Sequence, residues 1–127
     1  MTEIKVADEV WVATALLHKE NPERESFRAS EIVDRVYREN IHGRLRPGVQ
    51  VHVYMHCVAN KRPNPGNYRI LYAAEDGGRR LFRSGDDYHP YRDGGKTTPP
   101  PEEIPPKYRH LLEWYREEYD RRTRRRR

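Results

Sequence analysis

The chain has 127 residues, enough for one domain of ordinary size. Hydrophobic residues make up 35% of it and charged residues another 35%, which excludes a large core and leaves long polar segments outside it. The single cysteine, Cys57, excludes an internal disulfide and suits a reducing cytoplasm. Because the chain contains neither an apolar run of about 20 residues nor a basic-then-apolar leader, we predict neither membrane insertion nor secretion.

The net charge of +5 is concentrated near the C-terminal end. Residues 121–127 contain six arginines, and without them 19 Lys and Arg remain against 20 Asp and Glu. The rest of the chain is therefore balanced in charge, and a basic face on it must come from local clustering. Residues 61–98 are such a segment, with eight Lys and Arg against five Asp and Glu.

Two amphipathic helices are predicted in the first third of the chain. Residues 6–21 place apolar side chains at helical spacing, and Pro22 disfavours helical geometry at the end of that stretch. After a short extended piece at Phe27, residues 30–40 form a second apolar stripe, with Ser30 as the N-cap. Each pattern indicates a helix that buries one face.

The next stretch, residues 48–60, is compatible with a strand or with a buried helix. Val49, Val51 and Val53 alternate as they would in a strand. However, Val49, Val53 and Cys57 also recur at four-residue spacing, and the run is longer than most strands. We therefore favour a helix.

Residues 68–84 predict a β-hairpin. Tyrosine and isoleucine alternate with other residues along the first strand, as expected when one face is buried. The Asp-Gly-Gly sequence at 76–78 supplies the positive-φ positions that a tight turn requires. The return strand carries Leu81 and Phe82, with arginines on both sides.

The remainder of the chain divides into three segments. Residues 86–105 are rich in Gly, Pro and charge, so we expect a linker that lies along the surface or is partly mobile. Residues 106–120 predict an amphipathic helix whose aromatic stripe has two alternative roles: it closes over the core, or it pairs with its copy in a homodimer. Residues 121–127 form an arginine-rich tail that we predict to be disordered in isolation.

The predicted fold class is mainly α with a small β-hairpin (α+β). The order of helix, short extended piece, helix, helix and hairpin resembles a winged helix-turn-helix domain over residues 4–85. The stretch "HCVANKRPNPGNYRIL" also resembles an uncharacterised prokaryotic winged-helix family. The implied organisation is a winged-helix domain at 1–85, a linker at 86–105, a helix at 106–120 and a tail at 121–127.

This resemblance implies a DNA-binding module whose third helix enters the major groove and whose hairpin, the wing, contacts the DNA backbone or the minor groove. Matching side chains on the helix and the wing would reach base edges or phosphates. With the tail, the predicted nucleic-acid-binding residues are Gln50, Tyr54, Lys61, Arg62, Arg79, Arg80, Arg83, Arg121, Arg122, Arg124, Arg125, Arg126 and Arg127. Replacing Arg79 and Arg80 is expected to weaken binding to every DNA sequence and to flatten its salt dependence.

The expected function is that of a cytoplasmic DNA-binding protein, a transcriptional regulator or a nucleoid-type accessory factor. Duplex DNA is the expected partner, and RNA is an alternative. Val51, Met55 and Val58 fall on the predicted reading face, where polar residues are usual. These residues also fit an alternative interpretation, in which the chain is a non-catalytic protein-interaction module or a subunit of a larger complex, for which association with RNA is an option.

The sequence predicts no enzyme, metal site or cofactor. His52 and His56 have the i, i+4 spacing of zinc ligands, but neither a second cysteine nor a HExxH glutamate accompanies them. Asp86 and Asp87 could serve a nuclease metal, but consecutive carboxylates rarely converge on one ion. A metal-dependent nuclease is therefore the weakest interpretation.

Overall fold

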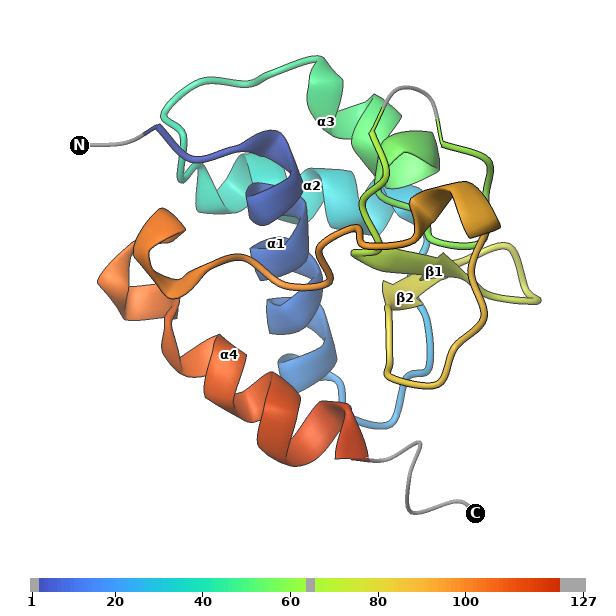
Figure 1. The fold of residues 1–127 in the computed structure, drawn as a ribbon. Helices are drawn as coiled ribbons and strands as arrows, with labels where there is room; N and C mark the ends of the chain where they lie inside the picture. The colour runs from blue at the N-terminus through green and yellow to red at the C-terminus, as the bar shows by residue number, and fades with distance from the viewer. Residues whose placement is uncertain (1–2, 64–65, 122–127) are drawn as a thin grey trace.

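The computed structural model describes residues 3–63 and 66–121. These residues form a mainly helical structure with one small antiparallel sheet, as the sequence predicts (Figure 1). The helices and strands are α1 (Val6–Glu20), α2 (Ala29–Glu39), α3 (Gly48–Val51) with its π-helical continuation η1 (His52–His56), β1 (Leu71–Ala73), β2 (Arg79–Leu81), and α4 (His110–Trp114) with its π-helical continuation η5 (Tyr115–Tyr119). Short 3-10 turns lie at Pro90–Arg92, Pro101–Glu103 and Pro106–Tyr108. We call residues 48–56 the third helix and 110–119 the fourth helix.

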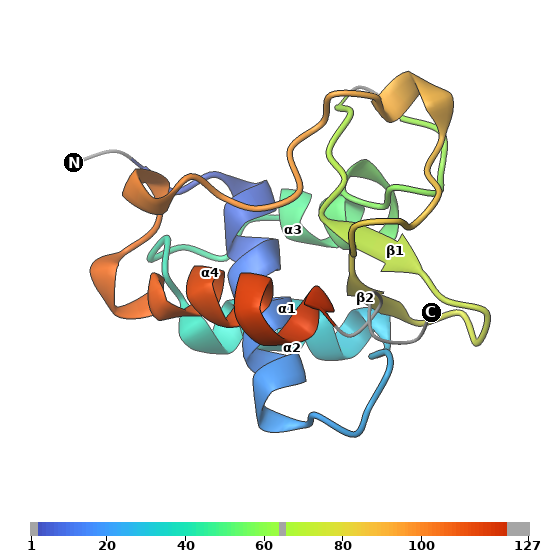
Figure 2. The same cartoon turned by 60° about the horizontal axis from the view of Figure 1, so that its bottom comes forward.

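The central element is α1, which lies between α2 and the fourth helix (Figure 2). Every residue from Ala7 to Ala15 is buried, including the polar Thr14, whose hydroxyl donates to the carbonyl oxygen of Val10 at 2.8 Å. A helix buried on all sides needs partners on all sides. The single apolar stripe predicted for α1 therefore describes only part of its buried surface.

The second helix begins earlier than predicted. Its N-cap is Arg28 rather than Ser30, and the carboxylate of Glu31 accepts a hydrogen bond from the backbone N–H of Arg28 at 2.8 Å. Glu31 thus satisfies one donor that the start of a helix leaves open. The Arg28 side chain is 81% exposed at this end of α2.

The third segment is helical, as favoured, and the strand alternative is wrong. Val49 and Val53 lie on its buried face, and Cys57 follows immediately as a buried residue. The helix ends at His56, four residues before the predicted boundary at Asn60. Asn60 instead hydrogen-bonds the backbone of Ala73 through both its amide atoms, at 2.9 and 3.0 Å.

The predicted hairpin is confirmed. Leu71 pairs with Leu81 and Ala73 with Arg79 in an antiparallel register. Phe27 adds a bridge to the free edge of β2, with Phe27 N to Arg79 O at 2.9 Å and Arg79 N to Phe27 O at 2.8 Å. The short extended piece predicted at Phe27 therefore joins the same sheet.

The segment 86–105 is more deeply packed than a surface linker. Arg92 and Ile104 are 0% and 2% exposed. Lys96 forms an ion pair with the buried Asp8 of α1 at 2.7 Å, although burial of this carboxyl raises its pKa. A Cβ at Gly95 would lie 1.7 Å from the Asn67 carbonyl oxygen, so only glycine fits this close approach. The segment therefore belongs to the same core as the helices.

The aromatic stripe of the fourth helix packs within the chain. Leu111 and Tyr119 are fully buried, and Trp11 of α1 meets Tyr115 edge-on at 5.9 Å between ring centroids. The aromatic stripe therefore closes over the core, which is the first of its two predicted roles. In the described part of the chain, no helix has both the length and the apolar character needed to span a membrane.

Candidate nucleic-acid interface

The third helix exposes one face to solvent. Gln50 and Tyr54 lie on this face, one turn apart, as predicted for residues that read bases. Val51 and Met55 are exposed beside them, at 42% and 45%. Val58, which the sequence also assigned to this face, is fully buried.

Two buried arginines satisfy the carbonyls at the end of the third helix. The last four carbonyls of a helix have no partner within it. Arg79 from β2 donates to the Val53 and Tyr54 carbonyl oxygens at 3.2 and 3.4 Å. Arg92 donates to the next two, those of Met55 and His56, at 3.0 and 2.8 Å. The hairpin and residues 90–92 thereby both fix the end of this helix.

The assignment of Arg79 as a phosphate contact does not agree with its placement. Arg79 is 6% exposed, and besides the two helix carbonyls its guanidinium donates to the carbonyls of Gly77 and Gly78 at 3.0 and 3.1 Å. Burial lowers the pKa of this arginine. Four of its five N–H donors serve the turn and the helix, which leaves Arg79 poorly placed to bind an external phosphate.

Arg80 and Arg83 are also engaged within the protein. Arg80 forms a two-pronged pair with Asp86 at 2.8 and 2.9 Å and lies over the Tyr72 ring at 4.5 Å. Arg83 is 6% exposed and lies over the ring of Tyr119 at 4.3 Å. Asp86 therefore serves as the partner of Arg80. The side chains of both Arg80 and Arg83 are directed into the protein.

The tip of the hairpin is acidic. Glu75 and Asp76 are exposed there. The Asp76 carboxylate accepts from the Ser26 hydroxyl at 2.7 Å and from the Gly78 backbone N–H at 2.8 Å, and these bonds lower its pKa. Two negative charges at the tip disfavour close approach of a phosphate backbone.

Exposed cations lie around the third helix instead. Lys61 and Arg62 follow it and are exposed, as predicted. Arg28, which the sequence did not single out, lines a cavity of about 370 Å³ together with Tyr54. Arg24 also lines it, but its guanidinium forms a two-pronged pair with Glu31 at 2.9 and 2.8 Å and holds the pKa of that carboxyl at about 2. Arg28 is therefore the more available cation beside Tyr54.

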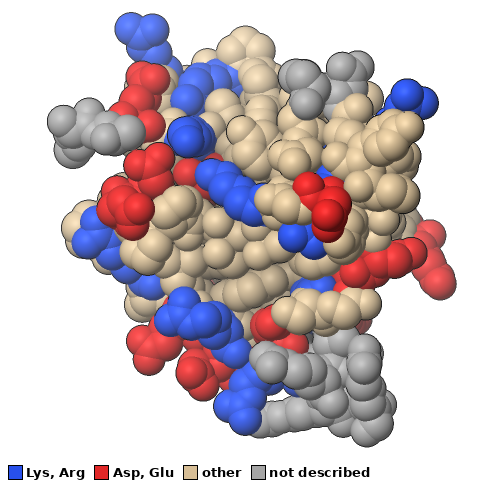
Figure 3. All heavy atoms as spheres, in the orientation of Figure 1, with Lys and Arg blue, Asp and Glu red and all other residues tan. Residues whose placement is uncertain are grey.

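The charge on the rest of the surface is mixed. Basic and acidic side chains are interspersed over the face drawn in Figure 3, as expected for a chain balanced in charge outside its tail. Of the predicted tail residues, Arg121 is exposed and lies 3.5 Å from Glu117. Arg122, Arg124, Arg125, Arg126 and Arg127 lie outside the described residues.

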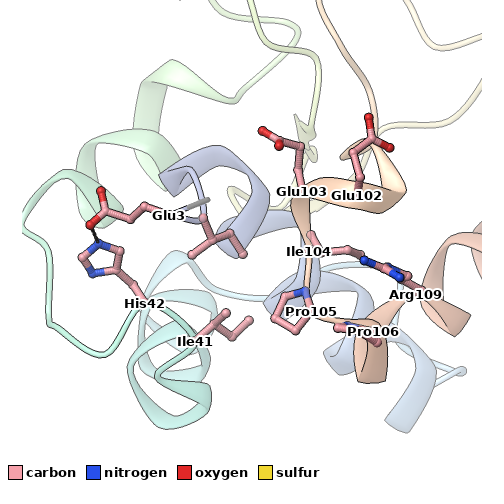
Figure 4. Close-up of a pocket in the computed structure, with 10 residues that line it drawn as sticks. Glu3, Ile41, His42, Glu102, Glu103, Ile104, Pro105, Pro106 and Arg109 are labelled. Carbon is pink, nitrogen blue, oxygen red and sulfur yellow. Dashed lines mark ion pairs between the residues drawn. The ribbon is translucent and has the colours of Figure 1, made fainter. Parts of the chain in front are cut away.

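A second cavity, of about 400 Å³, is acidic and belongs to another part of the molecule (Figure 4). Isoleucine and proline side chains line its interior, with Glu3, Glu102 and Glu103 among its polar residues. His42 pairs with Glu3 at 2.8 Å. The three carboxylates outnumber the one arginine of the lining, Arg109, so the cavity is poorly suited to phosphate.

The histidines of the third helix serve packing. The rings of His52 and His56 lie 5.1 Å apart edge-on, and His52 Nδ1 lies 3.3 Å from Cys57 Sγ. Among residues 3–63 and 66–121, no group of three His, Cys, Asp or Glu side chains has the geometry to hold a metal ion. Burial raises the pKa of the Cys57 thiol, which disfavours the thiolate that a metal requires.

His52 predicts a loss of stability in mild acid. Burial, with smaller contributions from His56 and Arg46, lowers its pKa from 6.5 to about 4. The unfolded chain therefore takes up this proton first, and stability present above pH 6.5 is lost as the pH falls towards 4. The free energy of unfolding, measured by urea titration at several pH values in this range, should depend less steeply on pH in His52→Gln than in the unchanged chain. The exposed His110→Gln serves as control, and an unchanged slope in His52→Gln would contradict the assignment.

Arg92 is the residue that sequence reasoning missed. It donates to five backbone carbonyl oxygens: those of Met55, His56, Lys61, Arg62 and Tyr68. Its only signal in the sequence is its position in a Gly- and Pro-rich stretch, where an arginine normally indicates a solvated loop.

Comparisons of the chain with known protein families, with characterised proteins and with solved structures give no match. The function is therefore argued from the geometry of the third helix and its surroundings.

Proposed function

We propose that this protein binds duplex DNA through the exposed face of the third helix, as a winged-helix regulator or nucleoid-type accessory factor of the cytoplasm. Gln50 and Tyr54 would contact base edges, the first through its amide and the second through its phenol. Arg28, Lys61 and Arg62 would bind phosphates on either side of them. The arginine tail would add attraction that does not depend on sequence.

The observation that carries this proposal is that buried arginines fix the backbone of the third helix. Gln50 and Tyr54 are exposed side by side, while two buried arginines take up the four carbonyls at the end of the same helix. A reading helix must present its side chains in a defined geometry, and fixed backbone positions provide it. The bridge from Phe27 to β2 adds support, since winged-helix domains place such an extended piece beside their hairpin.

The hairpin has a different role in this proposal from the one expected of a wing. Its arginines are directed inward and its tip is acidic. It would hold the reading helix and leave phosphate contacts to Arg28, Lys61 and Arg62.

The first test is a salt titration of binding to random duplex DNA, with the full chain and with a chain ending at residue 120. The tail should contribute part of the salt dependence, because each phosphate contact adds about 0.9 to the logarithmic slope. The shorter chain should retain a reduced slope from cations around the third helix. Complete loss of binding in the shorter chain would mean that the folded body does not bind DNA.

A second comparison locates the contacts. Replacing Lys61 and Arg62 together by alanine should reduce the salt slope by about 2, because two phosphate contacts are removed. Arg116, exposed on the fourth helix, gives a matched control as Arg116→Ala. Equal effects of the two changes would show general electrostatic attraction rather than an interface at the third helix.

A further inference from the structure

Exposed apolar side chains are gathered at and beside the third helix, and apart from Tyr54 DNA binding does not explain them. Val51, Tyr54 and Met55 are 42%, 48% and 45% exposed, and Tyr91 is 68% exposed. We call these four residues the apolar face. The fifth exposed large hydrophobic residue in the described parts of the chain is Leu45, in the loop just before this helix. Exposed apolar side chains are thus gathered at one region, whereas scattered ones would need no explanation.

Val51, Tyr54 and Met55 share one side of the third helix. Tyr91 belongs to the segment that Arg92 joins to the end of this helix. Val51 and Met55 are one helical turn apart, and Tyr54 lies beside both. Tyr91 precedes Arg92, whose guanidinium donates to the Met55 carbonyl at 3.0 Å, so the end of the helix and residues 90–92 are joined. Figure 1 shows this segment close to the end of the third helix.

These side chains suit a protein partner better than base edges. Valine and methionine offer no hydrogen bond to a base, and their only specific contact in the major groove is a thymine methyl group. Methionine adapts to irregular apolar surfaces and recurs where helices dock. Tyrosine and arginine are among the residues that most often dominate protein–protein binding energy.

Exposed cations lie at both ends of the apolar face. Arg62 lies 5.8 Å from the Tyr91 ring, and Lys61 precedes it. At the other end Arg28 and Tyr54 line the same cavity. Asp76 also lines that cavity as a carboxylate, and a carboxylate oxygen of Glu31 lies 3.9 Å from Arg28 Nε. The charge at this end is therefore mixed, and the positive charge is concentrated at Lys61 and Arg62.

We call Arg28, Lys61 and Arg62 the rim of the apolar face, and their charge indicates which kind of partner fits it. A second copy of the chain placed on this face by a two-fold axis would bring like charges close together. A partner with an apolar stripe bordered by carboxylates would complement both the face and its rim.

We propose that the apolar face docks an acidic amphipathic helix of another protein. Its apolar side chains would cover Val51, Met55 and Tyr91, and its carboxylates would pair with Arg28, Lys61 and Arg62. Because Gln50 and Tyr54 belong to the same side of the helix, the bound partner would exclude DNA. Docking stands on the apolar face and the cations beside it, and only the competition rests on the proposed function.

The test uses the full chain and two synthetic helical peptides that share a leucine stripe, one bordered by glutamate and one by lysine. Fluorescence anisotropy should show binding of the glutamate peptide at least tenfold tighter than that of the lysine peptide. Val51→Ser combined with Met55→Ser should weaken it at least tenfold. Both side chains are exposed, so the variant should keep its thermal unfolding midpoint, and Arg116→Ala should bind as the unchanged chain does.

Several results would overturn docking. One is failure of the glutamate peptide to bind, and another is equally tight binding of the lysine peptide. An unchanged affinity in the double serine variant would assign peptide binding to the arginine tail. Sedimentation that shows a dimer of the unchanged chain and a monomer of the serine variant would assign the face to a second copy.

Competition is tested separately on a labelled random duplex. The glutamate peptide should displace this DNA from the full chain, with less displacement from the double serine variant. If the peptide binds but DNA does not, the proposed function fails while docking stands. If the peptide and the duplex bind at the same time, the proposal that they use the same face is wrong.

Discussion

Replacing Arg92 by methionine is expected to lower the free energy of unfolding by about 3–5 kcal/mol, because buried carbonyls would lose charged donors and be left unpaired. Arg92 is 0% exposed, and its guanidinium donates to five carbonyl oxygens at 2.6 to 3.4 Å. No carboxylate among the described residues forms an ion pair with it. Burial accordingly lowers the pKa of Arg92. Urea unfolding followed by circular dichroism measures the change.

Two further variants give this experiment its controls. Arg62→Met removes an exposed arginine from the adjoining segment and should change stability by less than about 0.5 kcal/mol. Arg92→Lys keeps the charge but replaces a planar fork of five donors by a single ammonium group, so most of the loss should remain. Equal stability of Arg92→Met and the unchanged chain would show that water can replace the guanidinium.

A chain that ends at residue 105 is expected to lose cooperative unfolding altogether. It would lack six buried hydrophobic side chains: Tyr108, Leu111, Leu112, Trp114, Tyr115 and Tyr119. Burial of one large apolar side chain contributes roughly 1.5–3 kcal/mol, and whole domains are stable by only about 5–15 kcal/mol. Removal would also expose the fully buried Trp11 of α1. Thermal unfolding followed by circular dichroism should show no sharp transition.

The matched control is a chain that ends at residue 120. It lacks only the arginine tail and should unfold at the midpoint of the full chain within a few degrees, since small surface changes shift stability little. A sharp transition in the chain ending at 105 would mean that residues 1–105 fold alone and that the fourth helix is an appendage. This outcome would restore the division predicted from the sequence.

The two structural arginines connect stability to the proposed DNA interface. Arg79 and Arg92 both act on the backbone at the end of the third helix, so changing either should disturb Gln50 and Tyr54 as well as the fold. Replacing Arg79 and Arg80 would therefore lower stability as well as any DNA binding. Lys61 and Arg62 are better probes of phosphate contact because they are exposed.

Several elements could be predicted from the sequence because their causes are local. The periods of the apolar residues predict α1, α2 and the fourth helix, and Asp76-Gly77-Gly78 predicts the hairpin turn. The exposure of Gln50 and Tyr54 also follows from a local cause, since Val49 and Val53 fix which side of the helix is buried. Length and charge similarly predict one modest core and a balanced body.

Only the tertiary structure decided which arginines face solvent. Arg79, Arg80, Arg83 and Arg92 resemble Arg62 in the sequence, yet each has its partners within the protein. The Arg92 acceptors lie 24 to 37 positions away in the chain, so no local pattern reveals them. An unpaired carbonyl at the end of a buried helix requires a donor, and the folded chain supplies that donor from whichever segment passes close to it.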